Sequence, residues 1–145
     1  MYKHILVATD GTDLSKRAVQ NTLELAKALG AKVTAVRVSG KPAHVVVFGV
    51  DITDLPEETR ARILKDIEDH LAWVRSEAAA RGVPCEAIRV ESEHVWTGVL
   101  DTAEARGCDL IAMASHGRAG LTAKLLGSET KKVLTHSKIP VLVFR

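Results

Sequence analysis

Two glycine-containing turns in the C-terminal third of the chain carry residue types that bind phosphate. The first is Ala114-Ser115-His116-Gly117, which follows a short apolar run; nine residues then separate Gly117 from Gly127-Ser128. Glycine lets backbone N–H groups approach a ligand closely, and N–H groups at the start of a helix attract anions. Ser128 can cap the following helix and also donate to a phosphate oxygen. The pattern predicts a nucleotide-phosphate site at the carboxyl end of a strand.

Asp10 is the second candidate for ligand contact, because it follows the apolar run at residues 4–9. An aspartate at such a junction can also satisfy N–H groups of its own turn, and the two roles can coexist. Ligands of parallel sheets sit outside the carboxyl ends of the strands. If the strands before Asp10 and Ala114 are neighbours, Asp10 and the glycine turns converge on one crevice.

The elements that must position these residues alternate along the chain. Apolar runs predict buried strands, and apolar residues at helical spacing predict helices between them. We expect strands over residues 4–9, 32–38, 85–90, 109–113 and 141–144, with helices ending at Gly30, Gly82 and near Gly107 and a last helix over 128–136. This order predicts one α/β domain spanning residues 1–145. Its fold is a five-stranded parallel sheet with helices on both faces.

Local signals mark two helix starts. Thr12 is the expected N-cap of the first helix, and Asp54, three residues before Glu57, forms a capping-box pattern for the second. Between the second strand and this helix, the apolar stretch His44–Val50 interrupts an irregular connection. It is compatible with an added strand, a flap over the ligand or an interface, and the sequence does not decide among them.

Composition narrows the class of protein. With 46% hydrophobic residues, a net charge of +2 and 3% aromatic residues, the chain lacks the basic and base-stacking surface of a nucleic-acid binder. Two cysteines without metal spacing fit a reducing compartment, and the six histidines form no close pair. Neither a signal segment nor the roughly 18 apolar residues needed to span a membrane is evident. We therefore expect a soluble, cytoplasmic protein.

The chain resembles universal stress proteins over its whole length. HILVATDGT at residues 4–12 resembles their first strand and acidic turn, and SKIPVLVFR at 137–145 resembles their last strand. Between these segments lies a nucleotide signature of Gly, two residues, Gly, nine residues and Gly-Ser/Thr. This chain keeps the spacing and the final Gly127-Ser128 but has Ala114 in place of the first glycine. The resemblance implies a Rossmann-like fold of the adenine nucleotide alpha hydrolase-like type.

The resemblance also implies that the chain binds ATP, with Mg²⁺ on the phosphates. Asp10 would bond the ribose hydroxyls or help position the metal, and Val38 would hold the adenine through its backbone. Met113 and Ala114 would line the adenosine side, where the Ala114 methyl matters if that position needs a positive φ or touches the ribose. Ala8 and Thr9 are also expected in the site. Backbone or hydroxyl donors to the phosphates would come from Gly117, Gly127, Ser128, Glu129 and Thr130.

Fast ATP hydrolysis is not expected. Ser115 and His116 are adjacent, so their side chains are not expected to face each other as a catalytic dyad, and no G-x-S-x-G motif is present. Arg118 and Lys124 flank the predicted phosphate site, but no Walker motif accompanies them. We therefore expect both to be solvated surface residues. We expect a nucleotide-dependent regulatory module whose loop over residues 115–126 becomes ordered on binding and is read by a protein partner that the sequence does not identify.

The apolar run Val141–Phe144 is expected at a sheet edge, where it needs a pairing partner. The resemblance implies a homodimer formed by antiparallel pairing of these strands. Three other readings remain open. They are a stress protein of this fold that acts through protein contacts without a nucleotide, an adenine-nucleotide hydrolase-like enzyme, and a flavodoxin-like electron carrier, which the scarcity of aromatic residues disfavours.

Overall fold

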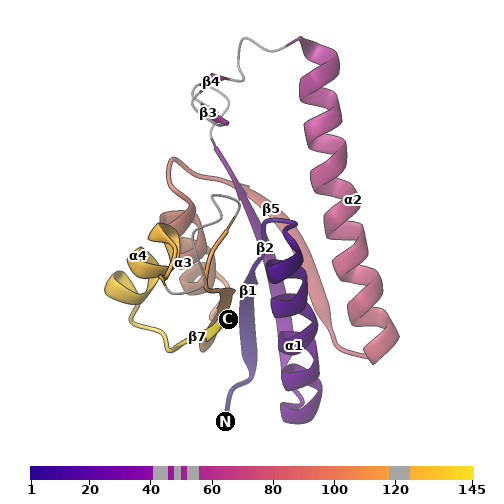
Figure 1. Ribbon diagram of the computed structural model, residues 1–145. Coiled ribbons are helices and arrows are strands. Elements are labelled where there is room, and N and C mark those ends of the chain that lie inside the picture. The colour runs from indigo at the N-terminus through magenta and orange to yellow at the C-terminus, as the bar shows by residue number, and fades with distance from the viewer. Residues whose placement is uncertain (41–45, 48–49, 52–55, 118–124) are drawn as a thin grey trace.

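The central sheet consists of five parallel strands, and the element labels are those of Figure 1. The computed structural model describes residues 1–40, 46–47, 50–51, 56–117 and 125–145. The strands are β1 (His4–Ala8), β2 (Lys32–Ser39), β5 (Cys85–Glu91), β6 (Leu110–Ala114) and β7 (Val141–Phe144). Their order across the sheet is β5-β2-β1-β6-β7. The predicted fold class is therefore confirmed.

Helices cover both faces of this sheet (Figure 1). Helices α1 (Asp13–Leu29) and α2 (Glu57–Arg81) pack on one face, and α3 (Val95–Ala105) and α4 (Ser128–His136) pack on the other. Two short strands, β3 (Val46–Val47) and β4 (Val50–Asp51), form a separate antiparallel pair. Among the helices that the structure describes, none combines the length and the apolar character needed to span a bilayer.

The core divides into two apolar layers because side chains of a strand alternate between the faces of the sheet. On β1, Ile5 and Val7 pack with α1 and α2, whereas Leu6 packs with α3 and α4, and all three are fully buried. The central strands are thus apolar on both faces, as expected for a parallel sheet with two helical covers.

The connections that follow β1 and β6 lead to opposite faces of the sheet. These strands pair directly, with Ile5 opposite Leu110 and Val7 opposite Ala112. The chain leaves β1 towards α1 on one face and leaves β6 towards α4 on the other (Figure 1). A crevice opens between connections that diverge in this way. The condition set for Asp10 and the glycine turns to converge is therefore met.

The helix signals were predicted with mixed success. Thr12 is the N-cap of α1, and its hydroxyl accepts the Ser15 N–H at 3.3 Å. Gly30 and Gly82 end α1 and α2 in the left-handed conformation, with φ of 64° and 68°. The capping box at Asp54 was wrong, because the N-cap of α2 is Pro56, which has no side-chain cap bond; Asp54 itself lies outside the described residues.

Several predicted strand bounds differ by one residue from the structure, and one predicted stretch is only partly described. Strand β6 extends one residue further than predicted, since Ala114 pairs with Phe144 instead of starting the turn. The first strand ends at Ala8 instead of residue 9, and β2 extends to Ser39. Within the stretch His44–Val50, only residues 46–47 and 50 are described, and they belong to β3 and β4. The rest of that stretch lies outside the described residues.

The packing of α2 yields a stability prediction. Leu71 is 1% exposed inside the layer under α1 and α2, whereas Leu64 of the same helix is 48% exposed. Leu71→Ala should lower the free energy of unfolding by about 2–5 kcal/mol, because it removes buried methyl groups and leaves a cavity. Leu64→Ala, the matched control, should change it by less than about 0.5 kcal/mol. Urea unfolding measures both, and equal effects would contradict this packing.

Candidate functional site

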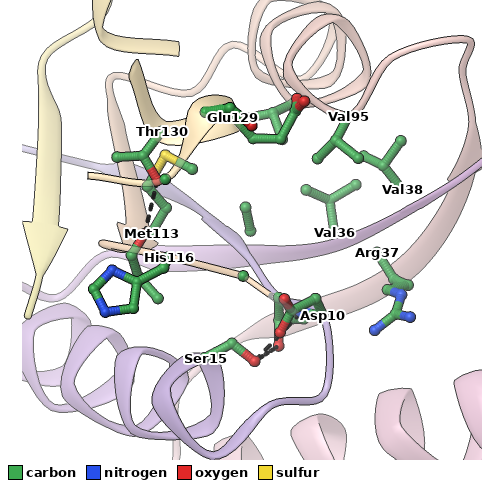
Figure 2. A pocket seen from close by; sticks show the side chains of 17 residues that line it. Asp10, Ser15, Val36, Arg37, Val38, Val95, Met113, His116, Glu129 and Thr130 are labelled. Carbon is green, nitrogen blue, oxygen red and sulfur yellow. Dashed lines mark hydrogen bonds between the residues drawn. The ribbon is translucent and has the colours of Figure 1, made fainter. Parts of the chain in front are cut away.

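A cavity of about 330 Å³ lies at the carboxyl ends of β1, β2 and β6 (Figure 2). Its lining contains every residue that the sequence analysis assigned to the site: Ala8, Thr9, Asp10, Val38, Met113, Ala114, Gly117, Gly127, Ser128, Glu129 and Thr130. It also contains residues that were not assigned: Ser15, Val36, Arg37, Val95, Val99 and His116. Residues separated by more than a hundred positions in the sequence thus surround one space.

One wall of the cavity is apolar. It is formed by Val36 and Val38 of β2 and by Val95 and Val99 of α3 (Figure 2). Gly98 lets α3 approach this closely, because a Cβ at that position would lie 2.8 Å from a methyl carbon of Val38. A glycine inside a helix weakens the helix and so often has a packing reason. That signal was present in the sequence but was not used.

The opposite side of the cavity holds the Asp10 carboxylate. The backbone N–H and the hydroxyl of Thr12 both donate to Asp10 Oδ1, at 3.0 and 2.6 Å. Burial by itself would raise the pKa of Asp10, but these hydrogen bonds, a further one from the Ser15 side chain and the charge of Arg37 outweigh it and hold the pKa below its ordinary value of 3.8. Asp10 therefore satisfies its own turn and also presents an ionised carboxylate to the cavity.

The first glycine turn lies against this carboxylate. A Cβ at Gly117 would stand 2.8 Å from Asp10 Oδ2, which is closer than real Cβ contacts. At Gly127 a Cβ would lie 3.2 Å from the His116 Cα and 3.3 Å from the Ser115 carbonyl oxygen, to which the Gly127 N–H donates at 2.8 Å. A side chain at either glycine would therefore crowd its neighbours, most closely at Gly117.

Helix α4 directs its N-terminus at the cavity. Its N-cap is Gly127, not Ser128 as expected, so Ser128 is the first helical residue. The first backbone bond of the helix joins the Lys131 N–H to the Gly127 carbonyl at 3.0 Å. The N–H groups of residues 128–130 consequently have no partner within the helix. Together with the helix dipole they give this end of the cavity positive potential.

Two predicted phosphate donors have side chains engaged in the fold. The Thr130 hydroxyl, 2% exposed as a residue, donates to the carbonyls of Ala114 at 3.1 Å and Ser115 at 3.3 Å. Glu129 Oε2 accepts the backbone N–H of Trp96 at 2.9 Å and so caps the first turn of α3. For both residues the backbone N–H is the group that remains suited to an anion. No local sequence signal marks the contact between Glu129 and Trp96.

Ser115 and His116 meet, contrary to expectation. Ser115 Oγ lies 3.0 Å from His116 Nδ1. Ser115 is 1% exposed and does not line the cavity, so its hydroxyl is shielded from a ligand, whereas His116 does line it. The pair fixes the shape of the turn and does not present a nucleophile. Arg118 and Lys124, which were expected to flank the phosphate site, lie outside the described residues.

Metal ligands are sparse in the part of the chain that the structure describes. No group of three His, Cys, Asp or Glu side chains gathers there closely enough to hold an ion. The carboxylates of the cavity come singly, from Asp10 and from Glu129. Such an arrangement can contribute one ligand to a cation that a bound anion holds with its own oxygens.

Known proteins are similar to this chain in sequence and in fold. A model of the Universal stress protein family matches residues 1–145. The universal stress protein YxiE of Bacillus subtilis is 33% identical over 150 aligned positions that cover 100% of both chains. Among solved structures, protein MJ0577 of Methanocaldococcus jannaschii has a TM-score of 0.80 at 26% identity, covering 99% of this chain and 95% of its own.

A further solved structure is a universal stress protein in complex with cAMP. It has a TM-score of 0.72 at 24% identity, and the likeness covers 99% of this chain and 97% of that one. At this identity the likeness shows the fold.

The environment of Asp10 predicts a pH dependence of stability. The pKa of Asp10 is lower in the folded chain than its ordinary value of 3.8, so the ionised form adds stability above that pH. That contribution is lost as the pH falls through the folded-state pKa. Asp10→Asn removes the charge, and urea unfolding from pH 7 to pH 3 should show the stability gap between variant and wild type shrinking below about pH 4. A constant gap would contradict this environment.

Proposed function

The chain belongs to the universal stress protein family, and from this premise we propose that it binds an adenine nucleotide, ATP in particular, as a regulatory module in a stress response. One observation carries the proposal. The glycine turns, the N-terminus of α4, the Asp10 carboxylate and an apolar wall all line one cavity. We infer that residues 1–145 act as a single domain of this family.

Each part of a nucleotide has a chemically matching surface in the cavity (Figure 2). The valine wall suits the flat apolar faces of adenine, with Val38 offering backbone groups to its edge. Asp10 is an acceptor for ribose hydroxyls. The N–H groups at the start of α4 suit phosphate oxygens. All three surfaces line the same cavity, so we expect one ligand to contact all of them.

The structure of a universal stress protein in complex with cAMP supports this assignment. It indicates that this fold can accommodate an adenine nucleotide, and the residues described above suit one here. The replacement of the first signature glycine is compatible with such a ligand. Ala114 lies in β6, paired with Phe144, so its methyl group sits on extended backbone that any residue adopts.

Mg²⁺ would accompany ATP. Magnesium binds through one or two carboxylates together with phosphate oxygens and water. Asp10, held ionised by Thr12 and Arg37, is the residue that we propose to contribute on the protein side. The ion would offset part of the phosphate charge beside this carboxylate.

We propose slow hydrolysis at most. Rapid phosphoryl transfer requires a residue that orients water and cations that stabilise the transferred group. Among the described lining residues, Arg37 is the cation whose charge acts on Asp10. Ser115 does not line the cavity and is buried, so its hydroxyl is not exposed to a ligand. Binding that changes the surface seen by a protein partner is therefore the activity that we assign. A regulatory module of this kind acts by occupancy, not by turnover.

The cysteines support a place in a reducing compartment, which we propose to be the cytoplasm. Cys85 and Cys108 are both free thiols. Burial raises the pKa of each to about 11, so neither is a reactive thiolate at neutral pH. We therefore assign no redox role to them.

Titration with ATP and Mg²⁺ tests the proposed function. Wild-type protein freed of nucleotide should bind with a dissociation constant in the micromolar range, measured by calorimetry. Asp10→Ala should weaken binding by about 1–3 kcal/mol, because a charge-assisted bond to the ribose is lost. Asp101→Ala, which removes the same charge from the exposed side of α3, is the control and should bind as the wild type does.

Absence of heat at millimolar ATP in the wild-type protein would contradict the proposed function. The chain would then be a member of this fold that acts through protein contacts alone. Equal losses in Asp10→Ala and Asp101→Ala would move the binding site away from the cavity.

We also propose a homodimer in which the β7 strands of two copies pair antiparallel. Strand β7 lies at the edge of the sheet. The Pro140 carbonyl accepts the Ile111 N–H of β6, and the Phe144 carbonyl accepts the N–H of Ser115, the residue after β6, so residues 140, 142 and 144 direct their backbone groups at β6. Because neighbouring residues point their backbone groups in opposite directions, Val141 and Val143 face the open edge.

Val143→Pro tests this pairing. Proline removes an N–H that points away from β6, so the β6–β7 ladder stays intact while pairing with a second copy is blocked. Sedimentation at micromolar concentration should show a dimer for wild type and for Val143→Ala, and a folded monomer for Val143→Pro. A monomeric wild type, or a dimeric Val143→Pro, would contradict the proposed interface.

A further inference from the structure

We propose that His70 of α2 is a positioning residue for the nucleotide crevice, acting through Thr9 on the turn that holds Asp10. The inference rests on the proposed function, because it assigns His70 a part in adenine-nucleotide binding. His70 does not line the cavity, and α2 covers the face of the sheet opposite the apolar wall of the crevice.

A series of hydrogen bonds connects His70 to the crevice. His70 Nε2 lies 2.8 Å from Thr9 Oγ1. Thr9 Oγ1 in turn lies 3.2 Å from Ser15 Oγ, and Ser15 Oγ accepts the Asp10 N–H at 3.3 Å. Thr9 and Ser15 are 5% and 2% exposed, so water competes little for these bonds. The chain runs from α2 through β1 and α1 to the backbone of the residue that we assign to the ribose.

Counting protons gives this chain one direction. The Ser15 hydroxyl lies 3.0 Å from the Thr12 carbonyl and also bonds the Asp10 carboxylate, and to either group it can only donate. With its one proton used there, Ser15 accepts from Thr9, so we assign the hydroxyl proton of Thr9 to this bond. His70 must then be the donor to Thr9, which assigns a proton to its Nε2 atom. Ser15 Oγ uses both lone pairs, on Thr9 and on the Asp10 N–H, so a change at His70 is passed along the whole chain.

The imidazole ring is held in place for this role. It stacks on Trp73, with 5.5 Å between ring centroids and 19° between planes. Lys16 of α1 lies over the other ring of this pair, with its Nζ 5.7 Å from the Trp73 centroid. The stacking on Trp73 and the bond to Thr9 thus restrict the orientation of His70, which is what a residue that positions another group requires.

A second histidine–threonine bond in the protein serves as the control. His4 makes the same kind of bond, 2.8 Å from its Nε2 to Thr34 Oγ1, and it is 8% exposed. This bond lies at the start of β1, at the end of the sheet away from the crevice. Loss of either bond leaves a buried hydroxyl with one partner fewer. Only the bond of His70 leads to the Asp10 turn.

Calorimetric titration of ATP with Mg²⁺ tests the inference on the full-length protein. His70→Leu should weaken ATP binding about fivefold or more, and His70→Gln, which restores an N–H donor, should bind within about twofold of wild type. Thr9→Val should show a similar loss, and His70→Leu with Thr9→Val should bind no worse than Thr9→Val alone. His4→Leu should lower thermal stability while leaving ATP affinity within about twofold.

The outcomes separate the two claims. Wild-type protein that does not bind ATP would overturn the proposed function and this inference together. Wild-type binding with unchanged affinity in His70→Leu, with additive losses in the double variant, or with an equal loss in His4→Leu, would overturn the inference alone. An ¹⁵N–¹H NMR spectrum that places the proton of neutral His70 on Nδ1 instead of Nε2 would also overturn it.

Discussion

The direct pairing of β1 with β6 is the constraint on which the rest of the structure depends. Each strand is apolar on both faces, so helices must cover both sides of the sheet. The chain therefore leaves these neighbouring strands in opposite directions, and their connections cannot fill the space between them. Asp10 after β1 and the glycine turns around β6 and α4 face that space because of this topology. The apolar core thus determines where the polar groups meet.

The charges in the crevice divide it into two ends. Asp10 is held ionised beside Arg37 and Thr12, whereas the start of α4 offers N–H groups and the positive end of a helix dipole. A ligand that is a hydrogen-bond donor at one end and an anion at the other satisfies both. This division supports the proposed nucleotide. Arg37, the cation of the cavity lining whose charge acts on Asp10, belongs to β2 and not to the start of α4.

Most of the fold could be predicted from the sequence because its signals are local. Apolar runs marked the strands to within one or two residues, and glycines marked the helix ends. The spacing from Gly117 to Gly127 marked residues that do line one cavity. The capping box at Asp54 failed because the N-cap of α2 is Pro56. The N-cap of α4 is Gly127, one residue before Ser128, and glycine is itself a favoured N-cap residue.

The contacts that sequence reasoning missed join residues far apart in the chain. Glu129 caps α3 through Trp96, Gly98 makes room for Val38, and His70 bonds to Thr9. Each contact depends on how the helices pack on the sheet and on one another, and no periodicity or motif in the sequence predicts that arrangement. Arg37 was missed because a single charge at the end of a strand is usually a solvated residue. Its effect on Asp10 became visible only once β1 and β2 were placed side by side.

A crystal structure of the protein grown with ATP and Mg²⁺ would test the central claim most directly. The account predicts adenine against the valine wall at Val38, ribose hydroxyls at the Asp10 carboxylate, and phosphate oxygens within hydrogen-bond distance of the N–H groups of residues 128–130. Nucleotide bound elsewhere on the surface, or an empty crevice at saturating ATP, would contradict it.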